Sequence, residues 1–342
     1  MAKKKRQLKR KTQEKRRSKL TVTDIDDRVI PFPSASPEFE PPAAMSQGLS
    51  PRLAMEQTMR ELQEALEGQE FTSKEEVDAL IADFNQRSLN SSTKPPDKGN
   101  PRHEAQDLAF QAMENPDPVA SAKLAMQAVE LDPQCVDALM HLARLSCDEK
   151  EELIEHMQMV VEVGEVGLGG PEFVEANKGH FWGLIETRPY MRARAYLAQL
   201  LAEAGQNEEA IEEYEALLDL NPNDNQGLRY HLLGLYLLAD NLDGVRRLFQ
   251  AFEDEGTAMF AWALVLERFL ADDEDGAAKA LKEARKSNKH VEAYVAGRKR
   301  MPEDCPDFFG FGDENEAIIC AEAIGAAWQQ NPPAVAWLKQ SR

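Results

Sequence analysis

The stretch GHFWGLIETRPYMRAR, residues 179–194, brings a His, a Glu, a Trp, a Tyr and three Arg into one short segment. His180 and Glu186 are residue types that exchange protons near neutral pH, so they suggest general acid–base chemistry. No nucleophile or metal motif accompanies them, so the segment favours a structural seam or a partner contact over catalysis. We expect Phe181 and Trp182 to dock hydrophobically.

Three arginines, Arg188, Arg192 and Arg194, fall at the expected start of the next helix. Pro189 suits the first helical turn, and the residue before a proline is disfavoured in the α region, so Arg188 is expected to lie outside the helix. Cations near a helix N-terminus oppose the macrodipole at a cost of a few tenths of a kcal/mol. We therefore expect these arginines to have anionic partners, either the protein's own acidic surface or a bound anion.

Two other stretches resemble ligand-binding loops. GFGDENEA (310–317) has the glycines of a phosphate loop but not the spacing, and its acids would repel phosphate. Asp313 and Glu316 fit a helix N-terminal capping box, with a carboxylate-bound cation as the alternative. DDEDG (272–276) suggests a calcium loop, but the position that needs a bidentate Glu is Lys282, so the stretch is interpreted as an acidic turn.

The common enzyme signatures H-E-x-x-H, G-x-S-x-G and G-x-G-x-x-G are absent from the sequence. The cysteines form no C-x-x-C pair, and no His cluster stands near them at zinc spacing, so we expect buried, reduced thiols: Cys135, Cys147, Cys305 and Cys320. The sequence therefore predicts a protein that is not an enzyme and has no cofactor and no metal site.

The N-terminal residues 1–19 differ in charge from the rest of the chain. They hold eleven Lys or Arg and one Glu, a formal charge of +10, while the whole chain carries −20, so the remainder carries −30. Such an arm suits salt-sensitive, sequence-independent contact with nucleic acid or the ribosome, folding back onto the acidic body, or attachment to an anionic membrane. The residues assigned to this contact are Lys3, Lys4, Lys5, Arg6, Lys9, Arg10, Lys11, Lys15, Arg16 and Arg17.

No apolar run approaches the ~18 residues of a membrane-spanning helix, and the basic N-terminus lacks the apolar core of a secretory signal. We therefore expect a cytoplasmic protein without a transmembrane segment.

The elements that position these residues are read from periodicity and composition. Residues 1–50 form a basic, Pro-rich tail that we expect to be disordered. Residues 51–90 predict a helical hairpin, whose first helix places Met55 and Met59 on its apolar face, and residues 91–101 a linker.

Residues 102–300 predict repeated pairs of helices, with an insertion near residues 164–188. Residues 301–342 predict a C-terminal helical cap. The clearest unit is 191–224, in which Gly205 turns the chain between two apolar-periodic segments and Pro222 follows the second. Scarcely any segment alternates with period two, so the predicted fold is all-α, an α-solenoid of helical hairpins.

The 191–224 unit resembles the tetratricopeptide repeat, with small Ala210 at the helix crossing, aromatic Tyr214 and terminal Pro222. More narrowly, NPNDNQGLRYHLLGLYL, ARKSNKHVEAYVAGRKRMP and GFGDENEAIICAEAIGAAWQQNPPAVAWLK resemble the suppression-of-tumorigenicity-seven family and its bacterial relatives over about residues 179–340. That resemblance implies a scaffold with no catalytic residues. Animal members of the family look membrane-bound, a location that is not carried over here.

The repeat resemblance implies a concave face built from the first helices of the pairs. In chaperone-binding members a Lys/Asn set grips a terminal carboxylate, but Ala195 and Gln199 stand at the matching positions, so that ligand is not expected. The expected function is a scaffold that binds another protein through this groove, and the alternative is an RNA- or ribosome-associated factor acting through the basic arm. The partner-binding residues assigned are Trp182, Arg188, Arg192, Arg229 and Tyr230.

Overall fold

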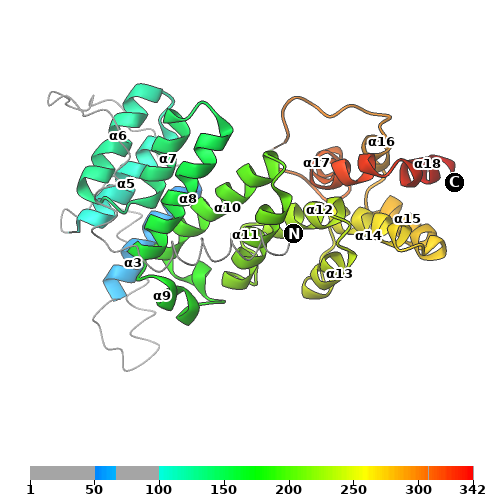
Figure 1. The fold of residues 1–342 in the computed structure, drawn as a ribbon, viewed down its shortest axis with the longest axis horizontal. Helices are drawn as coiled ribbons and strands as arrows, with labels where there is room; N and C mark the ends of the chain where they lie inside the picture. Colours follow the sequence, from blue (N-terminus) through cyan, green and yellow to red (C-terminus); the bar gives the residue numbers. More distant parts are fainter. Residues whose placement is uncertain (1–50, 67–99, 307, 342) are drawn as a thin grey trace, which may run out of the picture. The chain divides into compact units, whose positions relative to one another are not determined.

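The computed structural model of the chain describes residues 51–66, 100–306 and 308–341 (Figure 1). Every regular element within these ranges is helical, which confirms the all-α expectation. The chain divides into two compact units between Leu142 and Ala143. The basic arm of residues 1–19, the Pro-rich tail, the second helix of the 51–90 hairpin and nearly all of the 91–101 linker lie outside the described residues.

The first unit contains α3 (Pro51–Leu66), α5 (Pro101–Glu114), α6 (Pro118–Leu131) and the greater part of α7 (Val136–Ser146). Two of these helices begin in the same way. Asn100 and Asp117 are N-caps whose side chains accept backbone N–H bonds, and a proline occupies the first turn behind each.

Small side chains make the core of the first unit. Ala105, Ala109 and Ala112 of α5 meet Ala125 and Ala128 of α6, all fully buried. Alanines at a helix crossing let the two backbones approach closely, so α5 and α6 form an antiparallel pair with little side-chain volume between them.

The apolar face expected for α3 is not the one that packs. Met55 and Met59 are 66% and 40% exposed, while Leu53 and Glu56 are buried. On the same helix, Arg60 forms an ion pair with the buried Asp107 of α5.

The second unit contains the remaining helices: α8 (Lys150–Gly167), α9 (Pro171–Ala176), η1 (Phe181–Gly183), η2 (Ile185–Thr187), α10 (Arg188–Glu203), α11 (Asn207–Leu220), α12 (Leu228–Leu238), α13 (Leu242–Ala251), α14 (Ala258–Leu270), α15 (Glu274–Ser287), α16 (Val291–Val295), α17 (Glu314–Gln330) and α18 (Pro332–Gln340). Neighbours along the chain pack in pairs, namely α10 with α11, α12 with α13 and α14 with α15.

Helices α10 and α11 correspond to residues 191–224, the clearest repeat unit in the sequence. Gly205 adopts a φ of 74° between the two helices, a left-handed conformation that glycine takes without a steric cost. Ala210 and Tyr214 of α11 are buried, as the period-3.6 pattern requires. The turn and the apolar faces together close this helical hairpin.

The insertion near 164–188 is largely helical. After α8 ends, the short elements α9, η1 and η2 fill it, and Phe181 lies in a cluster of rings with Phe173 and Tyr190, each ring centroid 6.2 Å away. The expectation for Arg188 is wrong: it adopts α conformation (φ −61°, ψ −39°) although Pro189 follows. Hydrogen bonds from its side chain to the Trp182 carbonyl hold it there and offset the steric penalty.

The end of the second unit is organised by α17, which packs against α12, α14 and α16 (Figure 1). Trp262 of α14 and Trp328 of α17 are fully buried with their rings 6.4 Å apart. Gly234 of α12 lies so close to α17 that a Cβ there would stand 2.0 Å from the Ala323 carbonyl oxygen. The close packing of α12 against α17 therefore depends on glycine at position 234, which has no side chain.

In the ranges that the structure describes, no helix combines the length and apolar character needed to cross a bilayer.

Replacing Gly234 with Ala is expected to lower the free energy of unfolding by about 1–3 kcal/mol, because the methyl group would force α12 away from α17. Urea unfolding followed by tryptophan fluorescence measures this in the second unit, which holds all four Trp of the chain.

Gly325→Ala is the matched control. Gly325 is a buried glycine of α17 with no atom within 4 Å of its Cβ position, so Ala is expected to be neutral or to stabilise by up to about 1 kcal/mol. Equal losses from the two substitutions would contradict close α12–α17 contact as the cause.

Candidate partner-binding surface

Trp182 and Arg188, two of the predicted partner-binding residues, bind each other. The Nε and Nη2 atoms of Arg188 donate to the Trp182 carbonyl oxygen at 3.2 and 3.1 Å, and the guanidinium lies 4.6 Å from the centre of the indole ring. Arg188 is only 8% exposed. This cation–π and hydrogen-bonded pair fixes the turn into α10, which is the role of a structural seam.

His180 and Glu186 of the same stretch are both exposed, and no hydrogen bond joins them in the described part of the chain. An acid–base pair needs a shared proton path and a binding cavity. The geometry offers this pair no support.

Arg194 of α10 binds a carboxylate within the protein. Arg194 donates from Nε to Oε2 of Glu213 on α11 at 2.8 Å, and its guanidinium lies over the Tyr190 ring. Arg192 is half-buried and also interacts within the chain. Of the two partners expected from the sequence, the protein's own acidic residues are the ones that Arg194 meets.

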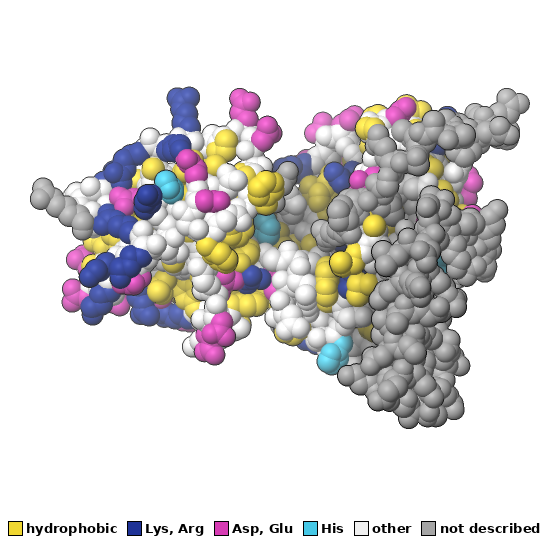
Figure 2. Space-filling model, turned by 180° about the vertical axis from the view of Figure 1, so that it is seen from behind, with side chains coloured by type: hydrophobic (Ala, Val, Ile, Leu, Met, Phe, Trp, Pro, Cys, Tyr) yellow, Lys and Arg dark blue, Asp and Glu magenta, His cyan; other side chains and the backbone are white. Residues whose placement is uncertain are grey.

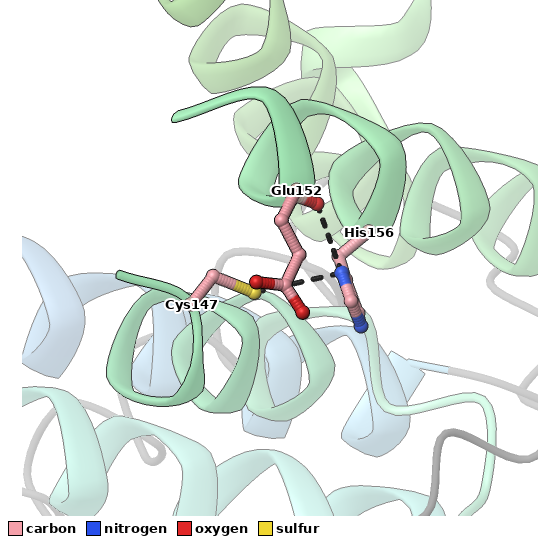
Figure 3. Close-up of side chains that lie close together, drawn as sticks. All are labelled: Cys147, Glu152 and His156. Atoms are coloured by element: carbon pink, nitrogen blue, oxygen red, sulfur yellow. Dashed lines mark hydrogen bonds between the residues drawn. The ribbon is translucent and has the colours of Figure 1, made fainter. Parts of the chain in front are cut away.

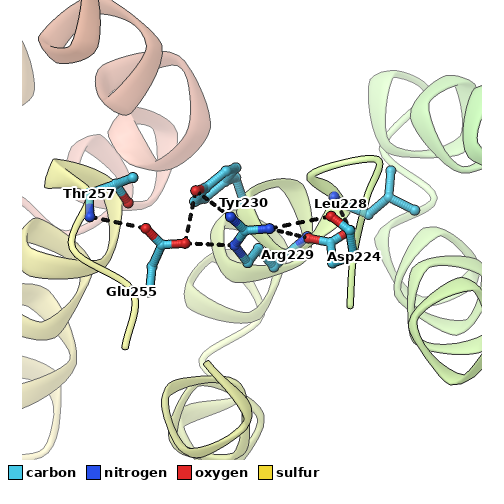
Figure 4. Close-up of polar contacts among 6 residues, drawn as sticks. All are labelled: Asp224, Leu228, Arg229, Tyr230, Glu255 and Thr257. Atoms are coloured by element: carbon cyan, nitrogen blue, oxygen red, sulfur yellow. Dashed lines mark hydrogen bonds and ion pairs between the residues drawn. The ribbon is translucent and has the colours of Figure 1, made fainter. Parts of the chain in front are cut away.

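Arg229 and Tyr230, at the start of α12, join two connecting segments (Figure 4). Arg229 donates from Nη1 to Oδ2 of Asp224 at 2.8 Å and from Nε to Oε2 of Glu255 at 2.8 Å. Tyr230 donates its hydroxyl to the same Glu255 oxygen at 2.9 Å and accepts from Nη2 of Arg229 at 2.7 Å. The group ties the segment before α12 to the segment before α14.

The two carboxylates of this network also hold helix starts. Asp224, whose side chain is fully buried, accepts from the backbone N–H of Leu228 at 2.7 Å and of Arg229 at 3.0 Å. Glu255 accepts from the N–H of Thr257, the N-cap residue of α14, at 3.0 Å. Arg229 therefore neutralises two acids whose lone pairs are already fixed by the backbone, a structural use of its charge.

The network shifts the pKa values of two of its members, Glu255 and Tyr230. Burial alone raises the pKa of the Glu255 carboxyl, but hydrogen bonds from Tyr230, the Thr257 amide and Arg229 outweigh it and leave the pKa below its ordinary value. Burial also raises the pKa of Tyr230 to about 12. Because the folded Glu255 pKa is depressed, its contribution to stability is present above the unfolded pKa and is lost as the pH falls through the folded pKa.

A shallow hollow of about 310 Å³ lies beside the Arg229 network. Its apolar wall comes from Phe249 and Phe252 at the end of α13 and from Phe260 on α14, with ring centroids 5.4 and 6.5 Å from that of Phe260. Ser287 at the end of α15 closes one side.

The segment before α17 exposes two large rings, which we call the aromatic loop (residues 308–312). Phe308 and Phe311 are 78% and 79% exposed, the largest values among the exposed large apolar residues described. The Phe311 ring lies edge-on to that of Phe309, with centroids 6.2 Å apart. Exposed phenylalanine rings this close together in the sequence are a candidate contact for a partner.

The backbone of the aromatic loop is held by three hydrogen bonds to side chains at the start of α17. Asn315 donates to the carbonyl oxygen of Phe308 at 3.1 Å, and the N–H of Gly310 donates to Oδ2 of Asp313 at 2.7 Å. The N–H of Gly312 donates to Oε2 of Glu316 at 2.7 Å. The exposed rings therefore project from a fixed backbone.

Glu316 anchors this loop to two other helices. Its carboxylate is fully buried and also accepts from the N–H of Ala258 at the start of α14 (2.9 Å) and from Nδ2 of Asn288 at the end of α15 (2.9 Å). Asp313 caps α17 by accepting from the Glu316 N–H at 2.8 Å, so the predicted cap is present. The Glu316 side chain, however, reaches across to other elements, which the local capping-box pattern does not predict.

The hollow and the aromatic loop adjoin. Ser287 lines the hollow, and its carbonyl oxygen lies 3.2 Å from the position of a Cβ on Gly312. The basic segment 298–300 borders the same loop, because Lys299 pairs with Glu314 at the start of α17. The hollow, the aromatic loop and this basic border together form the candidate partner-binding surface.

Positive charge gathers in one stretch of an acidic protein. Residues 279–300 hold eight Lys or Arg against two Glu, in a chain of formal charge −20. Figure 2 shows Lys and Arg side chains clustered on the second unit in the face that it draws. The exposed members are Lys279, Lys282, Lys286, Lys289, Arg298, Lys299 and Arg300.

Sequence reasoning assigned its site residues to the arginine-rich positions and missed Phe308 and Phe311. The signal was present, since three phenylalanines among glycines in a segment without helical periodicity have no core to enter. The stretch after them was interpreted as a helix cap, which is correct for Asp313 but says nothing of the rings before it.

No family model matches the chain, and no curated protein matches it either.

Replacing Arg229 with Met is expected to lower the free energy of unfolding at neutral pH by about 2–4 kcal/mol, since it leaves the buried Asp224 carboxylate without its cation. The loss should shrink as the pH falls through the lowered Glu255 pKa, where the native network weakens in the unchanged protein too. Urea unfolding at a series of pH values measures both effects.

Arg247→Met is the control, because Arg247 is exposed and lies 3.9 Å from its Glu215 partner; a change below about 1 kcal/mol is expected. A negligible loss in Arg229→Met would show that Arg229 is free for other partners and would overturn the structural assignment.

Proposed function

We propose that this chain is a non-enzymatic protein-binding scaffold, located in the cytoplasm, that contacts its partner through the candidate partner-binding surface of the second unit. Helix pairs joined by short turns support a tetratricopeptide-like arrangement, an architecture that offers extended binding surfaces. We place the partner contact on the aromatic loop and not on the residues assigned from the sequence. Trp182 and Arg188 bind each other, and Arg229 and Tyr230 bind the protein's own Glu255.

One observation carries this proposal: Phe308 and Phe311 are almost fully exposed on a backbone that is held by hydrogen bonds. Burying an exposed phenylalanine side chain is worth roughly 1.5–3 kcal/mol, so the pair represents a substantial unused contribution to binding. Because the backbone is already ordered, little conformational entropy is lost on association. Rigid aromatic anchors of this kind dominate the energy of protein–protein interfaces.

Charge specifies the chemistry of the partner. Arg298, Lys299 and Arg300 are all exposed, and the surface pairs of Arg298 with Glu292 and of Lys299 with Glu314 are weak enough for a partner's carboxylates to replace. A protein partner with an apolar cleft would bury the rings, and Asp or Glu beside that cleft would pair with these cations, while the hollow, which is lined by Glu253, Glu255 and Glu283, would repel acids.

The alternative is an RNA- or ribosome-associated factor that acts through the basic arm of residues 1–19, which lies outside the described residues. Arm binding would fall steeply with salt and would respond to nuclease, whereas an apolar contact survives moderate salt. The same experiment separates the two.

The test is photocrosslinking in the native cell, with a photoreactive phenylalanine analogue at position 308 or 311 and, as the matched control, at Val119, which is 65% exposed in the first unit. A discrete protein adduct is expected at 308 and 311 and not at 119. It should persist under nuclease and without residues 1–19. Once the crosslinked partner is identified, its binding is measured with purified proteins. The chain in which Phe308 and Phe311 are both Ala should bind that partner at least about tenfold more weakly, with no loss of stability.

Adducts that vanish with nuclease or with removal of residues 1–19 would establish the arm as the effector. Unchanged affinity in the double Ala variant would remove the aromatic loop from the interface.

A further inference from the structure

Three side chains of different metal-binding types converge where α7 passes into α8 (Figure 3). Cys147 directly follows the last residue of α7, and Glu152 and His156 stand four residues apart on α8, so they share one helix face. Their ligand atoms all lie within 4.8 Å of one another. In the described ranges this is the single such group of three, and all of it belongs to the second unit.

The spacing of the sulfur and nitrogen atoms fits a tetrahedral metal. Cys147 Sγ and His156 Nδ1 are 3.5 Å apart. Zinc–sulfur and zinc–nitrogen bonds of about 2.3 and 2.0–2.1 Å at a tetrahedral angle place the two ligand atoms about 3.5–3.6 Å apart. The pair is therefore already separated by the edge of a zinc coordination tetrahedron.

The donor set selects the metal. A thiolate and an imidazole disfavour Mg²⁺ and Ca²⁺, which take oxygen ligands, and together with one carboxylate they suit Zn²⁺. Asp148, Glu149 and Glu151 add negative charge around the group and favour a cation.

A Cys–His nucleophile is the competing interpretation of the same residues. A nucleophilic cysteine is activated by positive charge nearby, whereas the residues that follow Cys147 include four acids: Asp148, Glu149, Glu151 and Glu152. A zinc ion supplies the positive charge that this cluster of acids lacks.

We propose that Cys147, Glu152 and His156 bind one Zn²⁺ ion, with a water molecule in the fourth position. This goes beyond the proposed function and does not depend on it. Binding releases the thiol proton to solvent. His156 Nδ1 donates to the Glu152 carbonyl oxygen at 2.9 Å, so on zinc binding the ring proton would move to Nε2 and Nδ1 would turn to the metal. The ion fastens the turn after α7 to the first two turns of α8.

This group of three residues could not be predicted from the sequence. Cys147 and His156 are separated by nine positions with a turn between them, a spacing outside the usual zinc motifs. The expectation of buried thiols holds for Cys135 and Cys320, but Cys147 is half-buried and Cys305 is exposed.

The experiment titrates the reduced, metal-free full chain with Zn²⁺ against a chromophoric chelator, and with Co²⁺ followed by absorption. We expect one tight Zn²⁺ per chain and a Co²⁺ spectrum with a thiolate-to-metal charge-transfer band. Cys147→Ser should abolish that band, and Cys147→Ser and His156→Ala should each weaken Zn²⁺ binding by at least about tenfold.

Cys305→Ser is the matched control, because Cys305 is an exposed thiol hydrogen-bonded to Glu322 with no His in the group. It should retain the band and the affinity. Circular dichroism of each variant verifies folding. Absence of tight Zn²⁺ binding in the unchanged chain, or a charge-transfer band that survives Cys147→Ser, would overturn the proposal, and neither result bears on the crosslinking experiment.

Discussion

The second unit depends on one buried carboxylate. Glu316 is fully inaccessible and lies between three donors that belong to the start of α14, the end of α15 and the aromatic loop. A buried charge is costly unless its lone pairs are filled, so the three segments must meet at this point for the fold to be stable. The N-terminus of α14 adds a favourable dipole.

Other contacts extend from this junction. Asn288, which donates to Glu316, also donates to the Asp313 carbonyl oxygen and accepts from Nε1 of Trp262. Trp262 packs against Trp328 of the same helix that carries Glu316. The polar network around Glu316 and the packed tryptophan rings thus support each other, and together they hold the aromatic loop in place. Arg188, Arg194 and Arg229 make contacts within the chain while Phe308 and Phe311 are exposed, the reverse of the division expected from residue type alone.

The sequence predicted what is local. Periodicity and turn chemistry gave the α10–α11 hairpin around Gly205, and side-chain spacing gave the Asp313 cap of α17. It could not give contacts between distant positions, such as Glu316 with Ala258 or Cys147 with His156, because nothing in a helical pattern reports which faces meet. Arg188 shows the same limit: the rule for the residue before proline is local, and a tertiary hydrogen bond overrides it.

Amide hydrogen exchange in Glu316→Gln, compared with the exposed control Glu322→Gln on the same helix, tests the central claim most directly. The Gln amide retains one acceptor and turns an NH₂ group toward a donor, so we expect the Gly312 and Ala258 amides, protected in the unchanged protein, to exchange at least about tenfold faster while those of α10 stay unchanged. Rapid exchange at Gly312 in the unchanged protein, or equal behaviour of the two variants, would contradict an aromatic loop held in place by the buried carboxylate.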